Sequence, residues 1–153
     1  MIATPISCVV DASVGIKLVI TEALSGQAHA LFAHLASDPA ARFYVPDLFD
    51  IECANILWKQ IQRSGYPLAD AQLNLATLTA LALQRLPVTA LVTETLVIAA
   101  DLGISAYDAC YIAASWRLGV PLVTADSKLV AKMAGTPYVA LDLGNLTIPP
   151  HPP

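Results

Sequence analysis

The sequence predicts an α/β fold in which helices cover both faces of a parallel sheet. Short runs rich in β-branched residues alternate with longer stretches of helical periodicity, as expected for parallel strands joined through helices. The chain has 153 residues, of which 56% are hydrophobic, so one domain with one sizeable core is expected. No internal repeat or long linker is visible. We therefore expect a single domain over residues 1–146 and a frayed, Pro-rich tail over residues 147–153.

Five short strands are predicted. They cover residues 6–10, 42–45, 86–88, 120–124 and 138–141. The first is rich in β-branched residues and ends at Asp11-Ala12-Ser13, and the second stops at Pro46. Because proline has no backbone N–H to donate, Pro87 confines the third strand to an edge of the sheet.

Seven helices are predicted between these strands. They cover residues 16–20, 27–37, 47–63, 67–84, 89–102, 105–118 and 127–134. Apolar residues recur at helical spacing from Ile51 to Ile61, and Pro67 stands where the start of a helix tolerates proline. Gly103, Gly119 and Gly135 mark three helix ends. Part of the long apolar helical pair at 47–84 is expected to leave the body of the domain and serve an interface.

Only 13% of the residues are charged, about half the usual fraction. A membrane-spanning helix needs about 20 mainly apolar residues, and polar side chains interrupt the longest charge-free stretches, 23–37 and 71–84. The apolar surplus is better explained by a deep core and a protein–protein surface. There is no secretory signal at the start, and Cys8, Cys53 and Cys110 are scattered, so a cytoplasmic protein with buried thiols is expected.

The net charge of −4 argues against a broad nucleic-acid-binding surface. If the chain contacts RNA, bound metal and a few local cations must offset the repulsion.

Two aspartates follow predicted strands. Asp11 comes directly after the first strand, and Asp126 comes two residues after the fourth. In open parallel sheets, binding sites form beyond the carboxyl ends of the strands, so both side chains are expected at one edge. Each has an equally good alternative role, since an Asp between a strand and a helix often caps that helix.

Two further acids stand at the start of apolar helical stretches. Glu52 lies among mostly apolar neighbours, where a carboxylate is costly unless it is paired or bound to metal. Asn55 shares its helix face. Asp108 lies near the same expected crevice, although Ser105 and Asp108 also have the spacing of a helix capping box.

Four acids in one crevice would repel one another, and a hard cation that prefers oxygen ligands would remove that repulsion. Carboxylates without a His or Cys cluster favour Mg²⁺ or Mn²⁺ over zinc. Such ions activate water in phosphoryl transfer. The spacing alone leaves open whether the four acids converge.

The chain resembles a PIN domain, and within that group the VapC-type ribonuclease toxins of toxin–antitoxin pairs. Four stretches in order carry the resemblance, from Val9 to about Leu141. They are Val9-Val10-Asp11-Ala12-Ser13, Glu52-Cys53-Ala54-Asn55-Ile56-Leu57, Tyr107-Asp108-Ala109-Cys110-Tyr111-Ile112-Ala113-Ala114 and Leu122-Val123-Thr124-Ala125-Asp126-Ser127-Lys128-Leu129. One motif alone is unspecific, but four in this order are fairly specific.

The resemblance implies a three-layer α/β/α sandwich and a site for Mg²⁺ or Mn²⁺. It assigns the catalytic and metal-binding roles to four acids: Asp11, Glu52, Asp108 and Asp126. It implies that Ser13 and Thr124 line the acidic cluster and that Asn55 supports Glu52. Many relatives carry another acid just after the last Asp. Here Ser127 and Lys128 follow it, which puts a second metal position in doubt.

The implied reaction is hydrolysis of phosphodiesters in single-stranded RNA, with metal orienting a water. Lys17 and Lys128 are candidate phosphate contacts, with Arg117 next, although each is also readily explained as solvated surface. The resemblance further implies a homodimer and a small antitoxin lying in an apolar groove over the active site. The candidate contact residues for the antitoxin are Phe49, Trp58, Leu73, Leu75 and Leu78.

Three alternative functions fit the sequence less well. A PIN-like module that binds RNA or protein without cutting is disfavoured by the presence of all four acids. A haloacid-dehalogenase-like phosphohydrolase needs a second Asp where Ser13 stands. A Rossmann-type nucleotide-binding domain needs a Gly-rich loop after the first strand, and none is present.

Overall fold

The computed structural model describes residues 1–153 and has a central sheet of five parallel strands. The strands are β1 (Ser7–Val10), β2 (Arg42–Pro46), β3 (Gln84–Leu86), β4 (Leu122–Thr124) and β5 (Ala140–Asp142). Their order in the sheet is β3-β2-β1-β4-β5, so β1 is central and β3 is an edge strand, as Pro87 predicted. Val9 pairs with Tyr44 on one side and Leu122 on the other.

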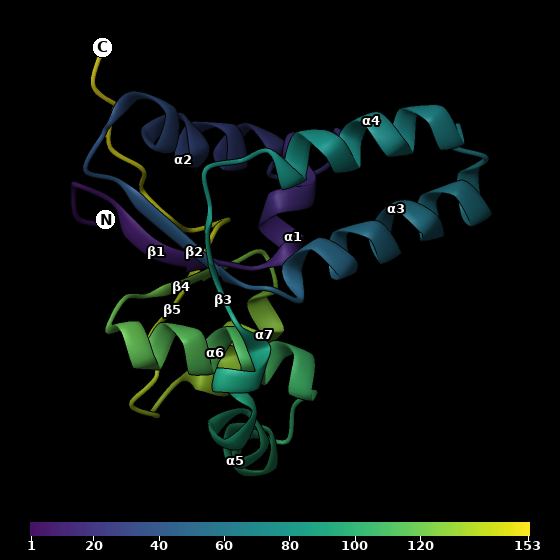
Figure 1. Cartoon of the computed structure of the whole chain (residues 1–153). Coiled ribbons are helices and arrows are strands. Elements are labelled where there is room, and N and C mark those ends of the chain that lie inside the picture. The colour runs from purple at the N-terminus through teal and green to yellow at the C-terminus, as the bar shows by residue number, and fades with distance from the viewer.

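Helices cover both faces of the sheet (Figure 1). They are α1 (Ala12–Gly15), α2 (Ser25–Ser37), α3 (Phe49–Ser64), α4 (Leu68–Thr79), α5 (Val92–Leu102), α6 (Ala106–Leu118) and α7 (Ser127–Met133), with short 3₁₀ turns η1 (Ile16–Leu18) and η2 (Val88–Ala90). In Figure 1, α5, α6 and α7 lie on one side of the sheet, and α1, α2 and the α3–α4 pair lie on the other. The predicted three-layer α/β/α sandwich is confirmed.

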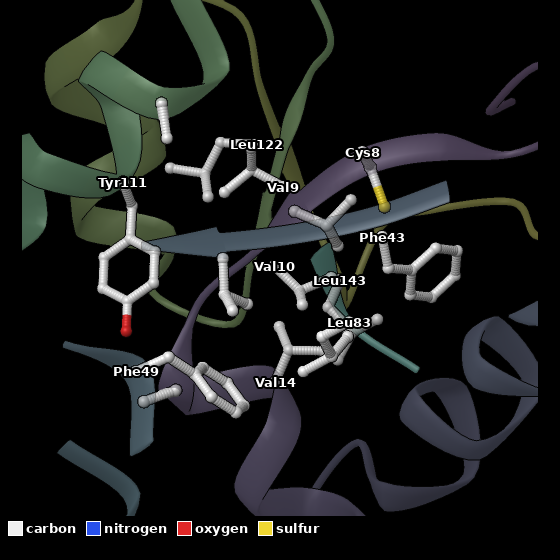
Figure 2. Packing of buried hydrophobic residues seen from close by; sticks show 14 of the residues in the cluster. Cys8, Val9, Val10, Val14, Phe43, Phe49, Leu83, Tyr111, Leu122 and Leu143 are labelled. Carbon is white, nitrogen blue, oxygen red and sulfur yellow. The ribbon is translucent and has the colours of Figure 1, made fainter. Parts of the chain in front are cut away.

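The core forms around the central strand. Cys8, Val9 and Val10 are fully buried because β1 has a strand on each side and helices on both faces. In Figure 2, side chains from both helical layers, including Tyr111 and Phe49, surround this strand. A central parallel strand of this kind is apolar on both faces, which explains why it reads as a continuous hydrophobic run.

The region after α4 differs from the prediction. A helix was expected to run to Gln84, but α4 ends at Thr79 and Gln84 begins β3. Leu83 is buried, and β3 pairs in parallel with β2. Residues with good helix propensity therefore leave the helix because pairing and burial outweigh propensity.

The first helical segment also begins earlier than expected. Residues 16–20 were predicted to be helical, whereas α1 starts at Ala12, directly after Asp11, and continues into η1. Gly15 allows α1 to approach α3 closely, because a Cβ at this position would lie 2.6 Å from Cζ of the buried Phe49 ring.

The α3–α4 pair extends away from the sheet, in agreement with the expectation that part of it leaves the body of the domain (Figure 1). Gly65, with a φ of 64°, ends α3 in the left-handed region that glycine adopts easily. Between the two helices lies an apolar groove of about 180 Å³, whose lining includes Leu57, Trp58 and Leu75.

Residues 147–153 form no helix or strand, but part of this tail is held against the domain. The backbone carbonyl of Pro149 lies 2.7 Å from Nε2 of the buried His34 in α2, and the amide of Ile2 donates to the carbonyl of Thr147. The start of the tail is therefore docked rather than frayed.

No single helix is both long and apolar enough to cross a membrane. Only α5 and α6 taken together reach that length, and they are bent by 115° at the break between them.

Candidate active site

The ends of β1 and β4 bring the first and last predicted acids to the same edge of the sheet. Val10 pairs with Val123, so Asp11 and Asp126 leave neighbouring parallel strands in the same direction. Asp11 is buried and caps α1 by accepting a hydrogen bond from the amide of Val14. Asp126 caps α7, with its carboxylate accepting from the amides of Lys128 and Leu129. The capping roles considered as alternatives are therefore real, and they fix the backbone on which both carboxylates sit.

Ser13 and Thr124 tie the ends of these two strands together. The Ser13 hydroxyl donates to Oδ1 of Asp11 and accepts from the amide of Ala125 at 3.0 Å. Thr124 Oγ1 lies 3.4 Å from Ser13 Oγ and accepts from the amide of Asp126 at 3.1 Å. Both side chains thus lie beside the acids, where the resemblance put them.

Glu52 reaches the same region from the first turn of α3. Its Oε2 accepts a hydrogen bond of 3.1 Å from the hydroxyl of Tyr111 in α6. Tyr111 is almost fully buried, so the phenol is held in one place by the core (Figure 2). Asn55, the residue expected to support Glu52, is exposed, and its side chain makes no hydrogen bond. Tyr111 was not among the predicted site residues, although its position about one helical turn after Asp108 was a usable signal.

Asp108 lies in the first turn of α6. Ser105 caps this helix by accepting from the amide of Asp108 at 3.1 Å. The predicted cap is therefore present, and Asp108 remains half-buried near the other acids.

Burial and mutual repulsion raise the pKa values of three of these acids. Burial is the main cause for Asp11, whose pKa rises to about 6, and repulsion from Asp108 adds to it. Burial also raises the pKa of Glu52 to about 7, opposed by the Tyr111 hydrogen bond and reinforced by Asp11 and Asp108. The pKa of Asp108 is raised by burial and by Asp126. Asp11, Glu52 and Asp108 therefore lie within electrostatic range of one another, and Asp126 is linked to them through Asp108.

The donor set suits a hard divalent cation. Carboxylate oxygens are the ligands that such a cation prefers. Its positive charge would also offset the repulsion between the carboxylates, which raises their pKa values. As the side chains stand, no group of three or more His, Cys, Asp or Glu residues is arranged to hold an ion. The carboxylates of Asp11 and Asp126 are turned toward helix amides, and that of Glu52 is turned toward Tyr111.

The candidate phosphate contacts differ in their surroundings. Lys17 is buried, and its Nζ forms an ion pair of 2.8 Å with Glu22, so its charge is already matched within the chain. Arg117 is paired with Glu94. Lys128, two residues after Asp126, is exposed and makes no side-chain hydrogen bond or ion pair.

Two of the apolar residues expected to contact an antitoxin are instead core residues. Phe49 and Leu78 are fully buried, so their assignment to a surface was wrong. Trp58 and Leu75 line the α3–α4 groove, and Leu73 is exposed. Helical spacing alone could not distinguish the two groups, because large apolar residues at that spacing occur both in the core and at exposed positions such as Trp58 and Leu73.

A second cavity, of about 630 Å³, lies at the opposite end of the sheet. Ser7, Pro121 and Val139 line it near the starts of β1, β4 and β5. It contains no acidic or basic side chain. The chemistry-bearing residues are therefore at the carboxyl edge and not in this cavity.

Comparison with known proteins identifies the family. Residues 8–135 match the PIN domain family. Ribonuclease VapC9 of Mycobacterium tuberculosis is 40% identical over 121 residues, which cover 79% of this chain and 87% of that protein. The chain belongs to the PIN domain family.

Solved structures agree with this assignment. PAE2754 from Pyrobaculum aerophilum has a TM-score of 0.67 at 25% identity and covers 91% of this chain and 92% of its own. A toxin–antitoxin complex from Klebsiella pneumoniae has a TM-score of 0.61 at 12% identity, with 89% and 97% covered. At that identity the second likeness shows the fold alone.

Proposed function

We propose that this chain is a metal-dependent endoribonuclease and the toxin of a toxin–antitoxin pair. The observation that carries the proposal is the electrostatic linkage of Asp11, Glu52, Asp108 and Asp126. This cluster lies in a PIN domain whose relative VapC9 is named a ribonuclease. The reaction is hydrolysis of a phosphodiester in single-stranded RNA, without a covalent intermediate on any side chain.

The four acids would hold Mg²⁺ or Mn²⁺, which prefer carboxylate oxygens. Bound there, the ion supplies an activated water and neutralises charge that develops on the phosphate. Ser13 keeps Asp11 oriented and Tyr111 keeps Glu52 oriented, as partners of metal ligands commonly do. We assign one ion, because Ser127 and Lys128 stand where many relatives carry another acid.

Lys128 is the cation that we assign to the scissile phosphate. It is exposed, unpaired and adjacent to the cap formed by Asp126. Lys17 is a weaker candidate because its charge is matched by Glu22.

The antitoxin segment is assigned to the α3–α4 groove. The groove is apolar, and its rim carries the exposed indole of Trp58. Support comes from the fold neighbour that is a toxin–antitoxin complex. An apolar helix face on the antitoxin would suit this groove, since such helices commonly bind in hydrophobic grooves.

A homodimer is a further part of the proposal. Three large apolar side chains of α5 are exposed, Val92, Leu96 and Val97, and the first two are one helical turn apart. Such a patch is typical of an interface. Sedimentation at several concentrations would measure self-association of the chain.

The three free, buried cysteines are consistent with the cytoplasmic location that we expect.

The proposal is tested by cleavage of labelled single-stranded RNA, after removal of any co-purified partner. Wild type with Mg²⁺ or Mn²⁺ should cut the RNA. Asp11→Asn and Asp108→Asn should each lose at least about a hundredfold in rate, because each removes a ligand charge. Asp70→Asn is the matched control, since Asp70 is exposed on α4 and its side chain makes no hydrogen bond or ion pair.

Two results would contradict the nuclease assignment. One is cleavage by both site variants at the wild-type rate, and the other is cleavage in excess chelator. A wild-type chain that binds RNA in the presence of metal but leaves it intact would favour the alternative, a PIN-like binding module.

A further inference from the structure

The chain has few cations, and most of them are already engaged. Of its eight Lys and Arg residues, three form ion pairs with acids: Lys17, Arg85 and Arg117. Two more donate to backbone carbonyls, Arg42 at Pro39 and Ala41, and Lys132 at Gly103. The three that make no hydrogen bond or ion pair through their side chains are Lys59, Arg63 and Lys128, and all three are exposed.

Two of these three cations lie on α3 in line with Glu52. Lys59 is seven residues after Glu52 and Arg63 is eleven, so at 3.6 residues per turn all three lie within about 40° of one another around the helix. At a rise of 1.5 Å per residue, Lys59 is about 10 Å from Glu52 along the axis and Arg63 about 16 Å. The exposed side chain of Asn55 lies between Glu52 and Lys59.

This face of α3 is distinct from the face that packs against α4. Leu57 and Ile61 line the apolar groove with Ala71 and Leu75 of α4. Their helical positions lie about 140° to 180° away from Glu52. Because α3 extends from the sheet edge away from the body of the domain, the cationic face leads outward from the acids (Figure 1).

We propose that Lys59 and Arg63 bind backbone phosphates of the RNA strand on one side of the scissile bond. The proposal rests on the proposed nuclease function and adds a path for the substrate. Phosphates of an extended single strand lie further apart than the 3.4 Å per nucleotide of a duplex, so the two cations would meet phosphates no more than roughly three and five nucleotides from the bond that is cut. Because the chain has a net charge of −4, its surface repels RNA, and the positive charges of Lys59 and Arg63 offset that repulsion along α3.

The test compares two double variants with equal charge change. Lys59→Gln/Arg63→Gln removes the proposed contacts, and Lys132→Gln/Arg42→Gln removes two exposed cations that are bonded to carbonyls elsewhere. Cleavage of a random-sequence 12-nucleotide RNA pool is measured across a NaCl series. In the first variant we expect KM to rise about tenfold with kcat within about twofold of wild type. The slope of log(kcat/KM) against log[NaCl] should become shallower by about 1.4, or about 0.7 per lost phosphate contact.

Substrate length provides a second readout. A dinucleotide pool has no phosphodiester beyond the scissile one, so all three proteins should cleave it equally. A loss on the dinucleotide equal to that on the 12-nucleotide RNA would indicate a structural defect and overturn the proposal. Single variants Lys59→Gln and Arg63→Gln, each with a slope change of about 0.7, serve if the double variant does not fold.

Failure of the path and failure of the nuclease can be distinguished. If the first variant cleaves RNA with the wild-type slope and KM, the proposed path is contradicted and the nuclease assignment stands. Equal losses in both double variants would show that the effect comes from net charge, which would also contradict the path. If wild type with Mg²⁺ or Mn²⁺ cleaves neither RNA, the nuclease assignment fails and the path fails with it.

Discussion

Tyr111 is the residue that best shows how this site depends on contacts between distant parts of the chain. It comes from α6, is almost fully buried, and donates to Glu52 from 59 positions further along the sequence. Removing the hydroxyl would leave a half-buried carboxylate without its donor, which disfavours the charged form that binds a cation.

Tyr111→Phe keeps the ring in the core and removes only this donor. We expect a roughly 10- to 100-fold loss of affinity for Mn²⁺, as seen for other partners of metal ligands. Isothermal titration calorimetry would measure it without relying on activity. Tyr66→Phe is the matched control, because it also deletes a hydrogen-bonded hydroxyl, here one that accepts from Asn74. Equal Mn²⁺ affinities for wild type and Tyr111→Phe would refute the role.

The sequence indicated which acids to consider but not how their side chains are held. Asp11 and Asp126 could be assigned to one edge because strand ends and capping positions are local signals. The Glu52–Tyr111 contact could not be assigned, since it depends on how α3 packs relative to α6. Asn55 shares a helix face with Glu52, yet it faces solvent.

At the scale of elements, the contact between α1 and α3 positions the start of the helix that carries Glu52. Gly15 lies against the buried ring of Phe49, three residues before Glu52. A larger residue at position 15 would displace this ring and, with it, the first turn of α3.

Gly15→Ala should therefore destabilise the fold by about 1–3 kcal/mol, the usual cost of overpacking a core. Urea unfolding would measure the change. Gly26→Ala in α2 is the control, because a Cβ there meets nothing within 4 Å, and alanine favours a helix by up to about 1 kcal/mol. If both variants unfold like wild type, the close approach is unimportant for stability.

Most elements could be predicted because their signals are local, such as the proline at the end of β2 and the glycines that end α5 and α6. The end of α4 could not. Residues 80–83 are alanines and leucines that suit a helix, and only their burial and the pairing of β3 with β2 end the helix at Thr79.

For the whole molecule, the buried acids make stability depend on pH in an unusual direction. The pKa values of Asp11 and Glu52 are raised from 3.8 and 4.5 to about 6 and 7. Between about pH 4 and 7 the folded chain therefore holds more protons than the unfolded chain, and its stability falls as pH rises through that window. The raised pKa of Asp11 alone lowers the free energy of unfolding by on the order of 3 kcal/mol as pH rises through this window. Glu52 is more exposed to solvent and adds less.

Urea unfolding in chelator at pH 5 and pH 8 would measure this dependence, and we expect the chain to be less stable at pH 8. Asp11→Asn should flatten the difference, because the amide does not titrate. Greater stability at pH 8 than at pH 5 in the wild type would show that these acids are not held in the surroundings described.

The strand order has a consequence for when the site can exist during synthesis. β4 is inserted between β1 and β5, so Asp126 can join Asp11 only after more than four fifths of the chain has been made. Chains are made from the N-terminus at roughly 5–20 residues per second. On a ribosome, a chain that carries β1, α3 and α6 still has only three of the four acids. Under the proposed function, a growing toxin would lack its complete set of acids until β4 has been made and inserted beside β1, which leaves a partner time to be present when the site forms.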